Sequence, residues 1–197
     1  MKKQTYHHGD LKQELIYNGL LLLNIEGFEG FSLRKVASMC GVSHNAPYKH
    51  FKDKHALINE IINEVWKEFN LALLKVTKLY PDKPKLQVVE MGKAYVRFMV
   101  ENPECFKLMF LSDNTRTIRI EDDRFYSEND NAFEIFKDCS ERYFREINLN
   151  KNLYTQKTLT MWSMVHGIAI LISKKSIEYK GDYLALVERM IITSIIQ

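Results

Sequence analysis

Apolar residues recur along most of this chain at the three- and four-residue spacing of amphipathic helices. The first such stripe consists of Leu11, Leu15, Gly19 and Leu22. Asp10, with Gln13 three residues later, resembles the capping box that begins a helix. Gly27 and Gly30 are expected to end this first helix.

Two short helices and a turn are predicted next. Ser32 is positioned to cap a helix that ends at Gly41, because glycine suits the left-handed backbone that follows many helices. Ser43 is expected to cap another helix, which runs to about Phe51. A helix, a short turn with glycine and a second helix form the helix-turn-helix pattern, whose second helix enters the DNA major groove.

A long helix is predicted after Asp53, since apolar residues recur at every fourth position: Leu57, Ile61, Val65, Phe69 and Leu73. Further helices are predicted over residues 83–101, 102–111, 132–147, 154–175 and 182–197. The polar, aperiodic residues 112–131 are predicted to form a loop. The sequence thus predicts an all-α protein, in which a three-helix helix-turn-helix domain, residues 1–55, is joined by the long helix to a helical bundle, residues 56–197.

The last two predicted helices carry apolar residues almost all round, whereas a helix on the surface should show one apolar stripe. We therefore expect both to be covered on two sides. A second copy of the chain can supply the additional cover, which predicts a symmetric homodimer. The alternative is a central pair of helices within the core of one chain.

The composition is compatible with a globular protein of the cytoplasm. The chain has 197 residues, 46% of them hydrophobic, which suffices for a sizeable core. Cys40, Cys105 and Cys139 are scattered without a CxxC pair, which argues against a disulfide framework or a zinc site. The N-terminus does not resemble a signal peptide, and the longest strongly apolar run, residues 161–172, is too short to span a bilayer.

The charge is unevenly distributed. Residues 1–55 contain 8 Lys and Arg against 5 Asp and Glu, so they carry the whole formal net charge of +3. Cations also lie at predicted helix starts, where the helix dipole favours negative charge. These starts carry Arg34 and Lys35, His44 and Asn45, and Lys54 and His55. Because helix N-termini with nearby cations bind phosphate, this pattern favours a nucleic-acid backbone as the partner.

Residues 43–51 concentrate side chains that are able to read DNA. Four of these side chains can hydrogen-bond base edges or phosphates: His44, Asn45, Lys49 and His50. Tyr48 can pack on a sugar and bond a phosphate, and Pro47 stiffens the beginning of the predicted helix. The alternative is an exposed polar helix, but the turn spacing and the charge distribution favour a recognition helix.

Residues 31–57, FSLRKVASMCGVSHNAPYKHFKDKHAL, resemble the DNA-binding signature of TetR-family transcriptional regulators. The matching residues are Phe31, Ser32, Val36, Ala37, residues 41–43, Tyr48, His50, Phe51, Lys54 and Leu57. YHHGDLK, APYKHF and WSMVHG, the last with Trp162, His166 and Gly167, resemble the subgroup that has a C-terminal WHG domain.

The resemblance implies an all-helical homodimer whose paired N-terminal domains bind a palindrome and whose C-terminal bundle holds a ligand site. By motif position, the implied DNA-backbone contacts are Ser32, Arg34, Lys35, Tyr48, His50 and Lys54. The implied base-reading residues are His44, Asn45 and Lys49, next to the capping Ser43. The arm KKQTYHH, residues 2–8, either adds DNA contacts or is a disordered tail.

The C-terminal region offers weaker signals. The candidate ligand-binding residues are Trp162, His166, Phe98, Phe106 and Met109. Trp162 and His166 lie four residues apart and share a helix face, so they either form a pocket wall or pack in a core beside a satisfied histidine. Tyr95, Met99 and Phe110 belong with Phe98, Phe106 and Met109 to an aromatic and methionine set that either lines a pocket or packs in the core.

No cofactor or metal site is predicted, because no enzyme motif occurs and the histidines do not pair at helical spacing. The sequence therefore predicts a cytoplasmic regulator that binds double-stranded operator DNA as a homodimer and responds to a small-molecule effector as a repressor. Alternatives are a transcriptional activator, an effector-less adaptor that acts through protein partners, and an all-helical enzyme that uses His166.

Overall fold

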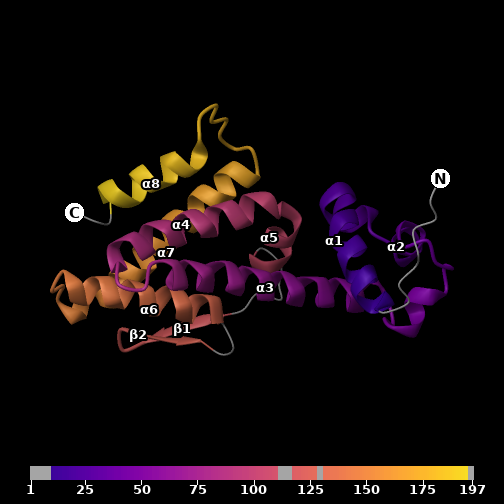
Figure 1. The fold of residues 1–197 in the computed structure, drawn as a ribbon, viewed down its shortest axis with the longest axis horizontal. Helices are drawn as coiled ribbons and strands as arrows, with labels where there is room; N and C mark the ends of the chain where they lie inside the picture. The colour runs from indigo at the N-terminus through magenta and orange to yellow at the C-terminus, as the bar shows by residue number, and fades with distance from the viewer. Residues whose placement is uncertain (1–9, 111–116, 128–130, 195–197) are drawn as a thin grey trace. The chain divides into compact units, whose positions relative to one another are not determined.

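The structure, a computed structural model, describes residues 10–110, 117–127 and 131–194, and α-helices dominate it (Figure 1). Packing divides the chain into two compact units, Met1–Val65 and Trp66–Gln197. The division falls within helix α3, Lys54–Leu79. The functional boundary expected from the sequence, at residue 55, lies near the beginning of the same helix and stays a prediction.

The first unit contains α1 (Leu11–Gly30), α2 (Leu33–Met39), the short 3-10 helix η1 (Ala46–Lys49) and the beginning of α3. The caps predicted from sequence are present in three of these helices. Asp10 Oδ1 accepts a hydrogen bond from the Gln13 N–H, and Ser32 Oγ accepts one from the Lys35 N–H. Asp53 Oδ1 accepts one from the Ala56 N–H at 2.9 Å.

Two glycines adopt the left-handed backbone that most residues avoid. Gly27 has a φ of 68° and interrupts α1, which then continues to Gly30. Gly41 also has a φ of 68° and follows α2, as the sequence predicted. Both breaks therefore use the one residue type for which this conformation carries no steric penalty.

The helix predicted from Ser43 to Phe51 is wrong in type and length. A turn leads instead into η1, and no side chain caps it. Pro47 explains the difference, because it has no N–H to donate to the Ser43 carbonyl in an α-helical pattern. The Ala46 N–H instead bonds to the Ser43 carbonyl at 2.9 Å, the tighter spacing of a 3-10 turn.

The core of the first unit is formed by apolar side chains of α1, α2 and α3. Its fully buried members include Leu15, Leu23, Val36, Ala37, Leu57 and Ile61. Gly19 permits α1 to approach α3 closely, because a Cβ at this position would lie 2.7 Å from Ile61 Cδ1. These contacts hold the turn and η1 on a rigid support.

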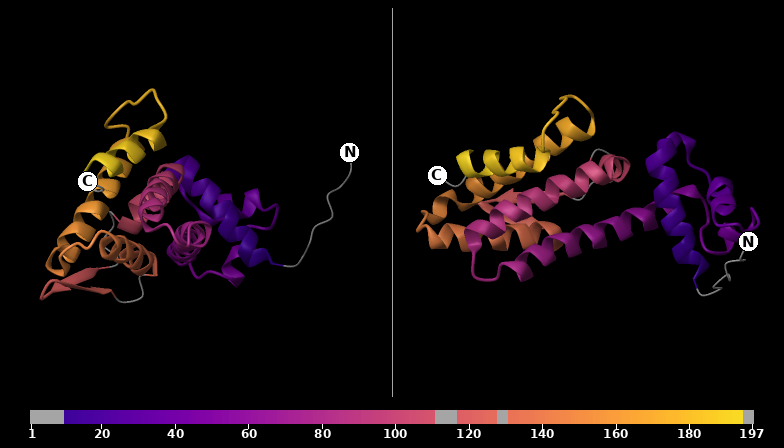
Figure 2. Two further views of the ribbon diagram at one scale, coloured as in Figure 1. Left: turned by 60° about the vertical axis from the view of Figure 1, so that its left-hand side comes forward. Right: turned by 45° about the horizontal axis from the view of Figure 1, so that its top comes forward.

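The second unit contains the rest of α3 and five further α-helices among the described residues. These are α4 (Pro84–Glu101), α5 (Pro103–Phe110), α6 (Asn131–Glu146), α7 (Tyr154–Ser173) and α8 (Tyr183–Ser194), with a 3-10 turn η2 (Lys151–Leu153) before α7. Helix α4 contacts α5, α6, α7 and α8, and α8 lies along α4 and α7 (Figure 2). The every-fourth-residue apolar pattern predicted for α3 is confirmed, since Leu57, Ile61, Val65, Phe69 and Leu73 are all buried.

The loop predicted over residues 112–131 is wrong where the structure describes it. Strands β1 (Ile118–Glu121) and β2 (Arg124–Ser127) form an antiparallel hairpin, with Glu121 opposite Arg124. Asp122 and Asp123 form the two-residue turn, with φ values of 48° and 55°. Two positive φ values in succession are the geometry of a type I′ turn, which Asp tolerates better than most residues. The short alternation of apolar and polar residues around this turn was the missed signal.

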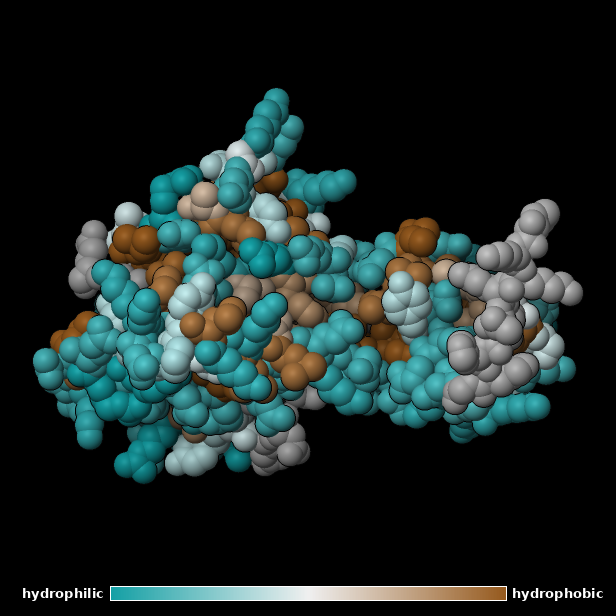
Figure 3. Space-filling model, in the orientation of Figure 1, coloured by the Kyte–Doolittle hydropathy of each residue, from teal (hydrophilic) through white to brown (hydrophobic). Residues whose placement is uncertain are grey.

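Hydrophilic residues cover most of the face shown in Figure 3, with hydrophobic residues in patches between them. None of the helices that the structure describes is long and apolar enough to cross a membrane.

Candidate nucleic-acid interface and apolar cavity

One hollow of the first unit is lined by polar side chains from α2 and from the segment before α3. It is formed by Arg34, Ser43, His44, Asn45 and Tyr48, all of them exposed. The structure thus brings together five of the residues that the sequence proposed for DNA binding. Lys49 and His50 are exposed on the same segment but do not line this hollow.

Buried neighbours fix the backbone of this segment. Pro47 and Phe51 are buried, and the Val42 N–H bonds to the Ala37 carbonyl at 3.0 Å. The polar residues between these anchors consequently project outward. His44 Nε2 also lies 3.4 Å from Ser38 Oγ, which donates to the Arg34 carbonyl at 3.0 Å.

The cations of the first unit differ in their surroundings. The Lys35 ammonium forms an ion pair with Glu26 and donates to the Gly30 carbonyl at 3.1 Å. The Lys54 ammonium lies 4.5 Å from the centroid of the Phe28 ring, within the range of a cation–π interaction. Arg34 instead lines the hollow with its side chain exposed. Lys35 therefore has a role within the fold, whereas Arg34 presents its guanidinium at the concave surface.

The proposed helix starts are only partly as expected. Arg34 and Lys35 lie in the first turn of α2, and Lys54 begins α3. His44 and Asn45 precede a 3-10 turn and not an α-helix. His44 and Asn45 therefore do not stand at the positive end of an α-helix dipole, although their side chains still line the hollow. The arm of residues 2–8 lies outside the described residues.

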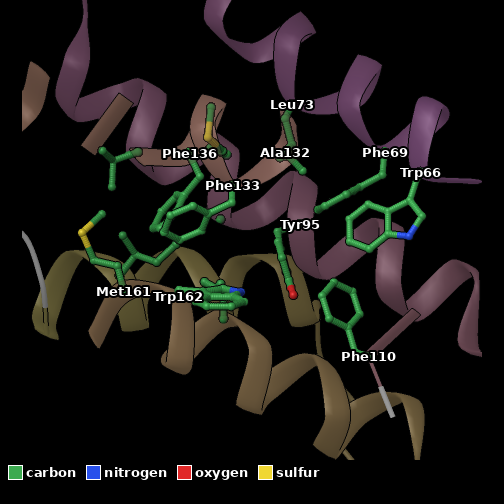
Figure 4. A pocket seen from close by; sticks show the side chains of 15 residues that line it. Trp66, Phe69, Leu73, Tyr95, Phe110, Ala132, Phe133, Phe136, Met161 and Trp162 are labelled. Atoms are coloured by element: carbon green, nitrogen blue, oxygen red, sulfur yellow. The ribbon is translucent and has the colours of Figure 1, made fainter. Parts of the chain in front are cut away.

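The second unit contains an apolar cavity between its helices (Figure 4). Its volume is about 40 Å³, counted as the space open to the centres of water molecules. The lining residues come from six helices, α3 to α8, of which α5 contributes Phe110 alone. They are Trp66, Phe69, Leu73, Val88, Met91, Gly92, Tyr95, Phe110, Ala132, Phe133, Phe136, Met161, Trp162, Val165 and Ile191.

A hydrogen-bonded pair stands at the wall of the cavity. Tyr95 Oη and His166 Nδ1 lie 2.7 Å apart. The imidazole packs edge-on against aromatic rings, with centroid distances of 5.3 Å to Phe106 and 5.0 Å to Phe110. This burial removes water from the imidazole and lowers the pKa of His166 below its ordinary value.

Of the five predicted ligand-binding residues, the structure places one in the cavity lining and four outside it. Trp162 lines the cavity, and His166 lies behind Tyr95 in contact with the Trp162 ring. Phe98, Phe106 and Met109 are not among the lining residues, although Phe98 packs on Phe69 and Phe106 on His166. Met109 is buried.

Several lining residues were missed by sequence reasoning. Trp66 and Phe69 belong to the apolar face of α3, and Phe133, Phe136 and Met161 to the apolar faces of α6 and α7. Their spacing is the spacing of any core residue, so no signal in one helix distinguishes a cavity wall from a filled core.

Comparisons with known proteins find a separate match in each of the two units. Residues 19–61 match the sequence profile described as bacterial regulatory proteins of the tetR family. Residues 88–193 match the profile described as the tetracyclin repressor-like C-terminal domain. The second match covers more than half of the chain; the finer assignment to the WHG subgroup stays a prediction.

Solved structures of several bacterial proteins share the fold. A protein of unknown function from Rhodococcus sp. RHA1 has a TM-score of 0.76 at 21% identity, covering 99% of this chain and 100% of its own. A TetR/AcrR-family transcriptional regulator from Thermobifida fusca has a TM-score of 0.67 at 16% identity, covering 94% and 98%. The fatty acid degradation regulator FadR from Bacillus halodurans has a TM-score of 0.63 at 11% identity, covering 98% of each chain. With both profiles matched over its two units, the chain belongs to the TetR family and is a transcriptional regulator rather than an enzyme.

Proposed function

We propose that this protein is a cytoplasmic repressor that binds a palindromic operator as a homodimer and leaves it when an effector occupies the apolar cavity. The observation that carries the proposal is the exposed hollow of Arg34, Ser43, His44, Asn45 and Tyr48, within the residues that match the profile of tetR-family regulatory proteins. Its donors and acceptors suit base edges and phosphates.

The proposed roles within this surface follow the surroundings of each side chain. His44, Asn45 and Lys49 are the base readers, and Arg34, Tyr48 and His50 contact the DNA backbone, since all six are exposed. Ser32 and Lys54 stand at the beginnings of α2 and α3, where they can approach phosphates. Lys35 contributes less than the sequence suggested, because its ammonium already pairs with Glu26.

Dimerisation is supported by the outer faces of the last two helices. Gly167 of α7 has no neighbour within 4 Å of the position that a Cβ would take, so it does not pack against the described part of its own chain. Leu159 and Leu171 of α7 and Ile192 of α8 are exposed large apolar side chains. We assign this face to a second copy of the chain. In a two-fold symmetric dimer the same patch of both copies forms the interface, so one exposed apolar face is covered in each copy.

Helix α3 is the element through which an effector would act. It contributes Leu57 and Ile61 to the core of the first unit, and Trp66, Phe69 and Leu73 to the cavity wall. A ligand that binds one position of α3 more tightly than another shifts the equilibrium between the two. Because half-sites lie about 34–36 Å apart for one DNA turn, a change in the spacing of the two DNA-binding units lowers operator affinity.

Selection of genomic fragments by the purified protein tests the proposal. We expect enrichment of a palindromic sequence whose binding weakens steeply with salt. Arg34→Ala should lower the affinity and reduce the magnitude of the salt slope by about 0.9 for each phosphate that the guanidinium no longer neutralises. Lys35→Ala, the neighbouring matched variant, should change the slope less.

Failure to enrich any sequence, or binding without salt dependence, would instead favour the adaptor that acts through proteins. Enrichment of a site at which the protein increases transcription would replace the repressor by an activator.

A further inference from the structure

None of the fifteen described residues that line the cavity carries a charged side chain. The polar side-chain atoms of this lining are the indole nitrogens of Trp66 and Trp162 and the hydroxyl of Tyr95. A carboxylate or ammonium group placed here would lose its hydration without gaining an opposite charge, which is strongly unfavourable. The lining therefore selects against acids and amines.

Aromatic rings form most of the wall. The aromatic members are Trp66, Phe69, Tyr95, Phe110, Phe133, Phe136 and Trp162. They already meet edge to face or tilted, with centroid distances of 5.4 Å between Trp66 and Phe110 and 5.4 Å between Phe133 and Trp162. Figure 4 shows the side chains of α3, α5, α6 and α7 gathered around the space beside Tyr95 of α4. Such edges and faces match those of a flat aromatic guest.

The cavity is smaller than an aromatic guest, so binding must displace side chains. An apolar cavity of about 150 Å³ is known to hold benzene, compared with about 40 Å³ here. Met91 and Met161 both line the space, and unbranched thioethers adapt to a new neighbour at low cost. A flat molecule requires less displacement than a globular one of equal mass, because it can enter between the existing rings.

Tyr95 contributes the one hydroxyl group among the described lining residues. A hydroxyl has one donor and two acceptor sites, so it can serve His166 and a ligand at the same time. His166 is held by its ring contacts with Phe106 and Phe110, and it fixes the direction of the Tyr95 hydroxyl through the 2.7 Å hydrogen bond. We therefore assign His166 as a positioning residue that acts through Tyr95.

We infer that the cavity takes an uncharged, flat aromatic molecule with one hydroxyl or carbonyl group, whose polar atom bonds Tyr95 while its rings lie among Trp66, Phe133 and Trp162. The inference deepens the proposed function and rests on the cavity being its effector site. It excludes a free fatty acid, despite the named role of the Bacillus halodurans fold relative, because the described lining residues offer no positive charge to a carboxylate.

Calorimetric titration of the full chain with probes of one skeleton tests this inference. The probes are 2-naphthol, naphthalene and 2-naphthoate, with decanoate as the acyl probe, at a pH where 2-naphthol is neutral. We expect 2-naphthol to bind about fivefold more tightly than naphthalene, from one added hydrogen bond. Both 2-naphthoate and decanoate should bind at least about tenfold more weakly than 2-naphthol.

Variants then locate the polar contact. Tyr95→Phe keeps the ring and should weaken 2-naphthol about fivefold while leaving naphthalene unchanged. Tyr17→Phe, at an exposed tyrosine of α1, should change neither affinity. His166→Gln should weaken 2-naphthol but not naphthalene, as expected of a residue that orients the hydroxyl.

Binding of 2-naphthoate or decanoate as tight as that of 2-naphthol would overturn the inference, as would the absence of binding by all four probes. Neither result needs a variant to fold, and neither affects the operator selection, which is performed without ligand. If 2-naphthol binds as expected but operator DNA is retained, the ligand class stands and the effector role in the proposed function fails.

Discussion

The two units of this protein present their candidate functional side chains in opposite ways. The first displays polar groups on one short, exposed segment, in which Ser43, His44, Asn45 and Tyr48 lie within a few residues of one another. The second lines its candidate site mostly with apolar side chains of six helices, α3 to α8, from Trp66 to Ile191. A local surface can be altered one side chain at a time, whereas a cavity wall is also the core that keeps the unit folded.

The largest effect that follows from this contrast is on stability in the second unit. Phe69 lines the cavity, is 2% exposed and packs on Trp66, Tyr95 and Phe98. We expect Phe69→Ala to lower the free energy of unfolding by about 3–5 kcal/mol. Urea denaturation followed by circular dichroism measures this loss. Leu71→Ala, at a 64% exposed position of the same helix, is the control and should change it little. A loss of similar size in both variants would show that the described packing is not what stabilises the unit.

The same contrast explains what could be predicted from the sequence. In the first unit, capping residues and glycines act locally, so Asp10, Ser32, Gly41 and Asp53 marked the ends of elements correctly. The error there was also local: Pro47 was expected to stiffen an α-helix, but its missing N–H produces a 3-10 turn.

In the second unit, the helices were predictable and the cavity was not. The apolar stripe of α3 predicted that Phe69 and Leu73 are buried. Which buried residues face a cavity depends on how α3, α4, α6, α7 and α8 pack, and periodicity within one helix carries no information about this. The sequence left His166 either in a pocket wall or satisfied in a core, and it could not identify the partner, Tyr95, which lies 71 positions away in sequence.

The next largest effect concerns DNA recognition. Asn45 is exposed in the hollow of the first unit and takes no part in its core. Asn45→Ala should relax the base preference at one operator position by about 1–3 kcal/mol. Binding to operators mutated at each position measures the change, and Asn59→Ala, an exposed asparagine of α3, is the control. Stability should change by less than about 0.5 kcal/mol. An unchanged base preference would remove Asn45 from the base-reading residues.

Two helical glycines allow a sharper comparison between a packed and an open face. A Cβ at Gly19 would lie 2.7 Å from Ile61, so Gly19→Ala should destabilise the protein by about 1 kcal/mol after its gain in helix propensity. A Cβ at Gly167 would have no neighbour within 4 Å among the described residues outside its own turn of helix. Gly167→Ala alone would then stabilise α7 by about 0.5–1 kcal/mol.

The sign of the Gly167→Ala effect tests the proposed dimer. If a second copy covers this face closely, the added methyl group weakens dimerisation, which analytical ultracentrifugation measures at several protein concentrations. Stabilisation with an unchanged dimer would place the interface elsewhere.

The smallest effect is a pH dependence carried by His166. Desolvation lowers its pKa in the folded state below the ordinary value of 6.5, so the unfolded chain binds this proton more readily. The contribution of this residue is therefore fully favourable above about pH 6.5 and is progressively lost as the pH falls through the lowered folded pKa. Comparison of the free energy of unfolding between pH 7.5 and 5 with that of His166→Gln isolates the effect, because the variant keeps every other titrating group. As the pH falls, the free energy of unfolding of the protein with His166 should decrease relative to that of the variant. A constant difference would mean that His166 is as well hydrated in the fold as in the unfolded chain, and that the wall beside Tyr95 is open to water.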